Sequence, residues 1–155
     1  MMSRLLLLLG LTLTLALIGC DSLPSMGERF SPVPPHTKVL NADHRTAFYA
    51  AQRALKAIDF VVTKAALAQG IVNGRSGLRD NEAFGEHRQY TMEIRLNDID
   101  DKHTEVAVLL HEEVEGELHT GATDQVLREH GLYDSYLEVL DQAVRDELAS
   151  PEPDR

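Results

Sequence analysis

The residues best suited to chemistry lie in one stretch, from His111 to His119. In an extended chain, side chains alternate with a period of two, so this stretch would place five ligand-type residues on one face: His111, Glu113, Glu115, Glu117 and His119. Imidazoles and carboxylates are plausible ligands for Zn²⁺ or a related divalent metal ion. The two histidines would lie about 26 Å apart along a straight strand, so only neighbouring ligands could share an ion. The alternative is a solvated, charged edge strand or loop that discourages aggregation.

The surrounding segment is strongly acidic. From Asp98 to Glu117 there are eight acidic residues and one basic residue, Lys102. This end of the domain is either a solvated acidic face or a surface that docks onto a basic partner, with an association that weakens as salt rises. An EF-hand loop starting at Asp98 would need Gly at its sixth position and Glu at its twelfth, where this chain has His103 and Leu109. We therefore expect a hairpin turn there rather than a calcium site.

Other catalytic or binding patterns find little support. The chain has one cysteine and no Gly-x-Ser-x-Gly sequence, and the glycines between Gly70 and Gly77 lack the Gly-Lys-Ser/Thr of a phosphate loop. We predict no enzymatic activity, no catalytic residue and no non-covalent cofactor. The formal net charge is −10, and nearby acidic residues match the arginines between Arg75 and Arg95, so no basic patch and no nucleic-acid partner are expected.

The amino terminus has the pattern of a targeting segment. A short positive region, Met1 to Arg4, precedes a 14-residue apolar run, Leu5 to Ile18. A helix that spans a bilayer needs about 20 apolar residues, so the run is short for a permanent anchor. It suits the hydrophobic region of a signal peptide, and residues 1–19 are therefore excluded from the fold.

The run ends in Leu17-Ile18-Gly19-Cys20, which resembles the lipobox of bacterial lipoproteins. The resemblance implies a diacylglycerol thioether on Cys20, cleavage after Gly19, and acylation of the new amine. It also implies a lipid anchor on the periplasmic side of a bacterial cell membrane. Because Cys20 is the only cysteine, no intramolecular disulfide can form, and lipid attachment explains its presence. An ordinary secretory signal or a short transmembrane anchor is the alternative.

Asp21 follows the cysteine directly. In enteric-type lipoproteins this residue resembles a signal for retention in the inner membrane, but the rule varies between bacterial groups, so inner and outer membrane both stay open. Residues 20–39 contain four prolines and no apolar periodicity, which predicts a flexible tether after the lipidated cysteine. Residues 150–155 are polar and proline-punctuated, which predicts a disordered tail.

Residues 40–149 show a single α+β pattern. A helix is expected from a cap at Asn41 or Asp43 to about Ile58, and a second from about Tyr133 to Leu148. Between them, apolar alternation and turn residues predict four strands: Phe60 to Ala66, Ile71 to Ser76, Tyr90 to Leu96, and Thr104 to Leu110. The predicted fold is a four-stranded antiparallel meander with both helices packed on one face, in the order α-β-β-β-β-α.

This pattern resembles a group of small bacterial lipoproteins of unknown function. The residues that carry the likeness are the junction Leu55-Lys56-Ala57-Ile58-Asp59-Phe60-Val61-Val62 and the following strand start Gly70-Ile71-Val72. It is also similar to lipoprotein subunits of outer-membrane assembly machinery. We therefore expect a non-catalytic interaction or structural module of the cell envelope, whose partners are the membrane and an envelope protein with a basic surface. The alternative is a periplasmic ligand-binding or divalent-metal-binding lipoprotein that uses the segment from His111 to His119.

Overall fold

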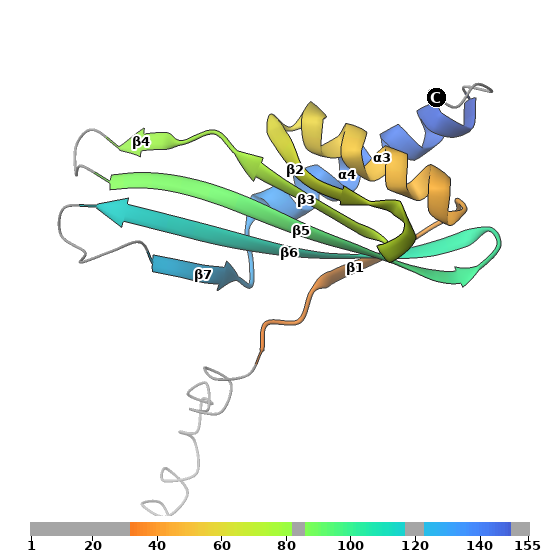
Figure 1. Ribbon diagram of the computed structural model, residues 1–155, viewed down its shortest axis with the longest axis horizontal. Coiled ribbons are helices and arrows are strands. Elements are labelled where there is room, and N and C mark those ends of the chain that lie inside the picture. Colours follow the sequence, from red (N-terminus) through yellow and green to blue (C-terminus); the bar gives the residue numbers. More distant parts are fainter. Residues whose placement is uncertain (1–31, 82–85, 117–122, 150–155) are drawn as a thin grey trace, which may run out of the picture. The chain divides into compact units, whose positions relative to one another are not determined.

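A computed structural model describes residues 32–81, 86–116 and 123–149 (Figure 1). The chain divides into two units, Met1–Pro32 and Val33–Arg155, and the elements below belong to the second. They are, in chain order, β1 (His36–Leu40), α3 (His44–Ala57), β2 (Phe60–Ala66), the 3-10 helix η1 (Leu67–Gln69), β3 (Ile71–Ser76), β4 (Arg79–Asn81), β5 (Glu86–Asp100), β6 (His103–Gly116), β7 (Thr123–Leu127) and α4 (Gly131–Ala149).

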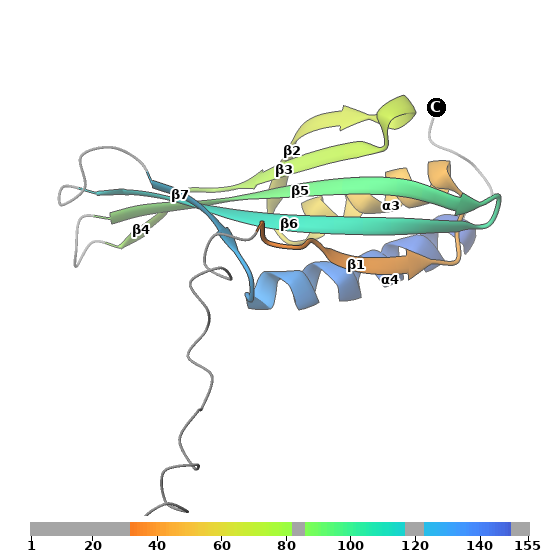
Figure 2. The same ribbon diagram turned by 90° about the horizontal axis from the view of Figure 1, so that it is seen from below.

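The strands of the described residues form one antiparallel, seven-stranded sheet. The main order is β1-β6-β5-β3-β2, while β4 pairs with β5 and β7 pairs with β6. The long β5–β6 hairpin therefore forms the centre of the sheet. β1 and β7 pair with the outer side of β6, and β3 and β4 pair with the outer side of β5. Both helices lie against the same face of the sheet (Figure 2). No helix of the described residues lies on the other face of the sheet, which we call the helix-free face.

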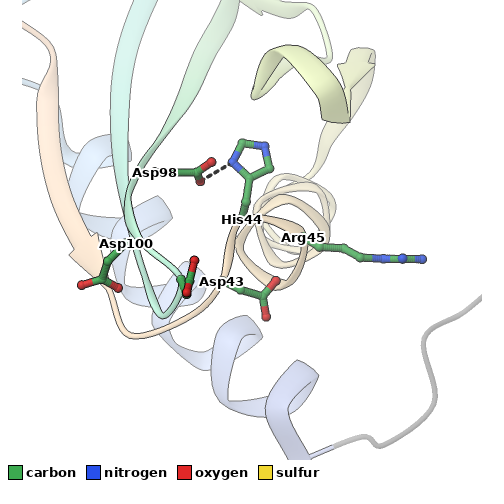
Figure 3. A pocket seen from close by; sticks show the side chains of 6 residues that line it. Asp43, His44, Arg45, Asp98 and Asp100 are labelled. Carbon is green, nitrogen blue, oxygen red and sulfur yellow. Dashed lines mark hydrogen bonds and ion pairs between the residues drawn. The ribbon is translucent and has the colours of Figure 1, made fainter.

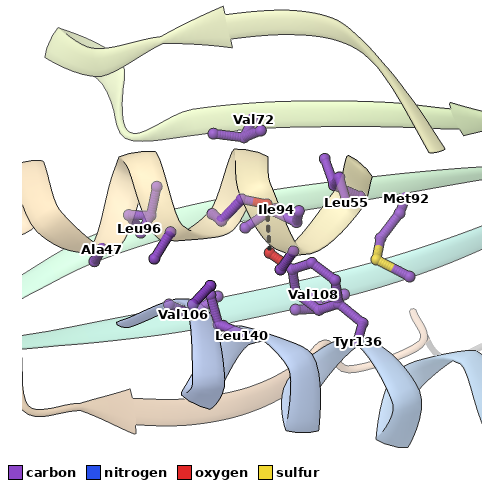
Figure 4. Packing of buried hydrophobic residues seen from close by; sticks show 14 of the residues in the cluster. Ala47, Leu55, Val72, Met92, Ile94, Leu96, Val106, Val108, Tyr136 and Leu140 are labelled. Carbon is purple, nitrogen blue, oxygen red and sulfur yellow. Dashed lines mark hydrogen bonds between the residues drawn. The ribbon is translucent and has the colours of Figure 1, made fainter. Parts of the chain in front are cut away.

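The helix-covered part of the sheet contains the hydrophobic core. Residues of β3, β5 and β6 that point toward the helices are fully or almost fully buried, among them Val72, Met92, Ile94, Leu96, Val106 and Val108. They pack against α3 and α4, as Figure 4 shows for Ala47, Leu55, Tyr136 and Leu140. The phenol of Tyr136 lies in this core and donates a hydrogen bond to the carbonyl of Ala51 (3.4 Å), which joins the two helices. Burial raises the pKa of Tyr136 far above its usual range.

Helix α3 begins and ends close to where the sequence predicts. Asp43 is its N-cap and accepts hydrogen bonds from the Thr46 amide (3.0 Å) and hydroxyl (2.9 Å). The inward face of the helix is largely alanine, and Ala47, Ala50, Ala51 and Ala54 have no exposed surface. Small side chains let the helix approach the sheet closely. Close packing of α3 on the sheet also favours glycine at position 74 of β3, because a Cβ there would lie 2.8 Å from the Leu55 side chain.

Part of the sheet projects beyond both helices (Figure 1). We call this part the sheet extension: β4, the first six residues of β5 (86–91), the last six of β6 (111–116), and β7. Its strands keep the register of the main sheet, with Arg88 opposite Val114 and Tyr90 opposite Glu112. The same β5–β6 hairpin thus runs from a helix-covered half into a half with no helix on it.

The predicted four-stranded meander is wrong, although the α+β class and the two helices agree with the structure. Three strands were missed, and each lacks apolar alternation: β1 follows Pro34-Pro35, β4 has three residues, and β7 is mostly polar. The two central strands are also longer than predicted. Pairing with the β5–β6 hairpin, rather than local hydrophobicity, keeps these segments extended.

β1 is held by side chains as well as by its ladder to β6. His36 stacks on Tyr133 of α4 with ring centroids 3.8 Å apart, and its Nε2 lies 2.8 Å from the carbonyl of Arg128. Lys38 forms an ion pair with Asp141 of α4. The position of β1 beside β6 continues the line of β7, because His36 pairs with Val108 and Leu127 pairs with Leu110. β7 thus occupies the part of the β6 edge that follows on from β1.

Candidate functional site

A charged pocket lies where the N-terminus of α3 meets the β5–β6 turn (Figure 3). Its volume is about 410 Å³, and its lining comes from two segments: Asp43, His44 and Arg45 at the start of α3, and Asp98, Asp100 and Asp101 at the turn. Asp101 and Lys102 form that turn, which agrees with the hairpin predicted from the sequence. Four carboxylates, an imidazole and a guanidinium thus line one pocket.

His44 is the centre of this pocket and contacts two other elements. Its Nδ1 lies 2.6 Å from Asp98 Oδ1 at the end of β5, and its Nε2 lies 3.0 Å from the carbonyl oxygen of Leu67 in η1. Both partners are acceptors, so both hydrogen bonds form together only when the ring carries two protons. Both ring nitrogens therefore face acceptors of the protein itself. The geometry therefore describes a clamp between α3, η1 and β5 rather than a general base.

Two other carboxylates of the pocket, Asp43 and Asp100, also have local partners. Hydrogen bonds from the Thr46 amide, partly opposed by burial, hold the pKa of Asp43 below its usual value. Asp100 accepts from the Lys102 amide (2.8 Å) and faces His103 Nδ1 (2.8 Å), and these bonds lower the pKa of its carboxyl. Three of the four carboxylates thus cap a helix, close a turn or bind His44: Asp43, Asp100 and Asp98. These hydrogen bonds stabilise the start of α3 and the β5–β6 turn.

A second polar cluster lies on the sheet extension, on the face that the helices cover elsewhere. Glu112 of β6 is 6% exposed and accepts three hydrogen bonds: from Tyr90 Oη (3.0 Å), Arg88 Nη1 (3.2 Å) and Gln125 Nε2 (2.9 Å). Burial raises the pKa of Glu112, but the bonds from Gln125, Tyr90 and Arg88 outweigh it and hold the pKa below its ordinary value. The ring of Tyr90 also contacts His130, with centroids 5.2 Å apart. This cluster joins β5, β6 and β7 where no helix packs.

The predicted metal-binding segment is partly described. His111, Glu113 and Glu115 lie in β6 and, from the alternation, on the helix-free face of the sheet. His111 Nδ1 is 3.3 Å from Asp124 Oδ1 of β7, and Glu113 is 4.0 Å from Arg75. Glu117 and His119 lie outside the described residues. Within residues 32–81, 86–116 and 123–149, no group of three or more His, Cys, Asp or Glu side chains could hold a metal ion.

The sequence did not point to His44 or Glu112, the two side chains at the centre of the polar contacts described above. Nothing in the sequence connects His44 to Asp98, which lies 54 positions away. Glu112 could have been found, because Val106, Val108 and Leu110 share a face and a period of two places Glu112 on that face as well. A carboxylate that continues a buried apolar row indicates either a partnered buried charge or the end of the core.

The residues of the lipobox, Leu17, Ile18, Gly19 and Cys20, lie outside the described residues, as does Asp21. Their roles stay predictions. Of the helices in the described part of the chain, none combines the length and the apolar character that crossing a bilayer requires.

A comparison with protein-family models finds no match, and a comparison with curated protein sequences finds none either. Among solved structures, the chain is similar to the adenylate sensor of AMP-activated protein kinase in complex with 5-aminoimidazole-4-carboxamide 1-beta-D-ribofuranotide. The two chains are 13% identical over 70% of this chain and 94% of that chain, with a TM-score of 0.43. A likeness of this size carries no argument about a ligand.

Proposed function

We propose that the protein is a membrane-anchored periplasmic lipoprotein and acts as a non-catalytic interaction or structural module of the bacterial cell envelope. The anchor rests on the resemblance of Leu17-Ile18-Gly19-Cys20 to the lipobox. Two or three acyl chains on Cys20 would hold the domain at the membrane far more firmly than one, since each buried CH₂ contributes about 0.8 kcal/mol. The domain would then act on partners close to that surface.

The observation that carries the interaction role is the charge on the helix-free face of the sheet. On β5, β6 and β7 this face presents five carboxylates: Glu93, Glu105, Glu113, Glu115 and Asp124. The lysine and arginines of the same face, Lys64, Arg75 and Arg95, lie toward the β2 side. A broad acidic surface that no described helix covers suits a partner with a basic surface, and the association should weaken as salt rises.

The anchor is tested by Cys20→Ala. The variant should remain unlipidated and should not be cut by the lipoprotein peptidase, because both steps need the thiol. Labelling with a radioactive fatty acid and mass spectrometry of the amino terminus measure this directly. Ser22→Ala is a matched control that keeps the cysteine and should be processed normally. Normal processing of Cys20→Ala would overturn the anchor.

The interaction role is tested by crosslinking in intact cells followed by purification. A stoichiometric envelope partner is expected, and the double variant Glu113→Lys, Glu115→Lys should lose it because the acidic face is reversed. The double variant Glu113→Gln, Glu115→Gln should lose less, since it removes charge without adding repulsion. A protein that purifies alone but carries a bound divalent ion would instead favour the metal-binding alternative.

A further inference from the structure

β2 forms one end of the sheet and pairs on one side only. Among the described residues its one strand partner is β3, and the order β1-β6-β5-β3-β2 places no described strand on its outer side (Figure 2). Half of the backbone N–H and C=O groups of an edge strand point away from the sheet and can pair with another extended chain. The register shifts between Val62 and Lys64, which divides this edge into two regular runs, Phe60 to Val62 and Lys64 to Ala66, and the first run follows α3 directly.

The start of β2 also offers side-chain contacts. Val61 is 69% exposed, more than any other large apolar residue in the described chain. On the helix side, a hollow of about 640 Å³ lies between the strand and the end of α3, and its lining residues are Gln52, Lys56, Asp59, Phe60, Val61 and Val62. A strand added beside β2 would place alternate side chains in this hollow and over Val61.

The charge around this edge is opposite to that of the rest of the molecule. Residues 44–78, which form α3, β2 and β3, contain five basic residues and one acidic residue, Asp59, whereas residues 86–149 contain seventeen acidic and five basic residues. All five basic residues of the first set are exposed: Arg45, Arg53, Lys56, Lys64 and Arg75. Arg53 pairs with Glu147 and Arg75 lies 4.0 Å from Glu113, while no ion pair joins Lys56 or Lys64 to a carboxylate in the described part of the chain.

We propose that the edge of β2 is a docking site for an acidic, extended segment of another protein, which adds to the sheet as an antiparallel or parallel strand. Backbone hydrogen bonds to the Phe60–Val62 edge supply affinity, and the hollow beside α3 receives a side chain. Lys56 and Lys64 lie on either side of that edge in the sequence and select for acidic side chains. This surface is distinct from the acidic face, and it does not depend on the lipid anchor.

A second copy of the chain is a poorer occupant than an acidic segment. Two-fold pairing of β2 with β2 would bring two copies of the same basic segment together, because residues 44–78 of each copy contain five basic residues, Lys56 and Lys64 among them, and one acidic residue. Like charges on neighbouring strands are destabilising. An acidic partner turns the same lysines into favourable contacts.

The test uses the full chain in a neutral detergent with two synthetic nine-residue probes, one alternating Val and Glu and the other alternating Val and Lys. Binding is measured by calorimetry, and the contacted residues by amide shifts in NMR spectra of ¹⁵N-labelled protein. The acidic peptide should bind at least about tenfold more tightly than the basic one, with shifts confined to β2 and the end of α3 and with an affinity that falls as salt rises.

Two variants at one exposed position supply the matched control. Val61→Glu should weaken binding of the acidic peptide by about tenfold or more, whereas Val61→Lys should bind it as well as the parent or better. Equal loss in both variants would show that the Val61 contact matters and charge does not, and would overturn the proposal. So would equal binding of both peptides, shifts away from β2, no binding of either peptide, or self-association through β2 in sedimentation equilibrium.

Discussion

The β5–β6 hairpin has two halves that differ in their surroundings but share one backbone ladder. In the first half, Ile94 and Val108 face α3 and α4 and have no exposed surface. In the second half, the corresponding face carries Arg88, Glu112 and, on β7, Gln125. The strand geometry and register continue without interruption between the two. What changes at the boundary is whether a helix lies on the sheet.

The difference shows which interactions stabilise each half. Where a helix covers the sheet, burial of apolar side chains contributes about 25 cal/mol for each Å² removed from water. Where no helix is present, a carboxylate bonded by a phenol, a guanidinium and an amide takes the place of the apolar core. Such a network stabilises a sheet only while all its members are bonded. The two halves should therefore respond differently to the same kind of change.

The largest expected effect is loss of volume in the covered half. Val108→Ala should lower the free energy of unfolding by about 2–3 kcal/mol, because it removes buried methyl groups and leaves a cavity. Val114→Ala is the matched control, since it lies on the same strand and the same face but is only partly buried, and it should cost less than about 1 kcal/mol. Urea denaturation measures both. Equal costs would mean that the extension is covered as fully as the core.

A smaller effect is expected from the polar network of the extension. Glu112→Gln removes the negative charge that faces Arg88. Its new amide NH₂ group would also face another donor, such as Gln125 Nε2, so one hydrogen bond is lost. The substitution should therefore lower the free energy of unfolding by about 1–2 kcal/mol at pH 7. Glu113→Gln is the control on the adjacent, more exposed position and should cost less than about 0.5 kcal/mol. Urea denaturation at pH 7 provides the measurement.

The cost of Glu112→Gln should also depend on pH. The pKa of Glu112 is lower in the fold than the 4.5 of an unperturbed glutamate, so its contribution is complete above pH 4.5 and is lost as the pH falls through the folded value. The difference between parent and variant should therefore shrink as the pH is lowered below about 4.5. A difference that stays constant from pH 7 to pH 3 would contradict the assigned hydrogen bonds.

The smallest effect is expected on the helix-free face. His111→Ala removes one contact with an exposed Asp124 and should change stability by less than about 0.5 kcal/mol. The same variant tests the metal prediction, because calorimetric titration of the parent protein with Zn²⁺ should give heat that His111→Ala loses if the segment binds the ion. No heat at micromolar Zn²⁺ would remove the metal-binding alternative and leave the segment as part of the acidic face.

Local periodicity was enough to predict both helices and the positions of β2 and β3. Asp43 caps α3 as expected, and Phe60–Ala66 and Ile71–Ser76 are strands with the predicted limits. Both helices and β3 bury a regular apolar face, so their spacing carries the information, whereas in β2 only Phe60 is buried and the apolar run with its following Gln69-Gly70 turn marked the strand. The Asp101-Lys102 turn was likewise predictable from the change between two alternating runs.

Elements defined by pairing rather than burial were not predictable. β7 has only polar or half-buried side chains and is extended because Leu127 to Thr123 pair with Leu110 to Val114. His44 contacts Asp98, 54 positions away, and Leu67, 23 positions away. A single sequence contains no pattern that indicates such long-range contacts. Glu112 is the exception, because its burial could have been inferred from the alternation that continues past Leu110.

The route of the chain into β1 has a mechanical consequence. If Cys20 is lipidated as proposed, a force that pulls the domain away from the membrane would act on the folded domain first at His36, where β1 begins. The load then falls on the five-residue ladder between β1 and β6, on the stacked rings of His36 and Tyr133, and on the Lys38–Asp141 pair. β7 and the rest of the sheet extension lie off this path. The anchored end of the domain would bear the strain, while the extension would stay unloaded and keep its shape for a partner.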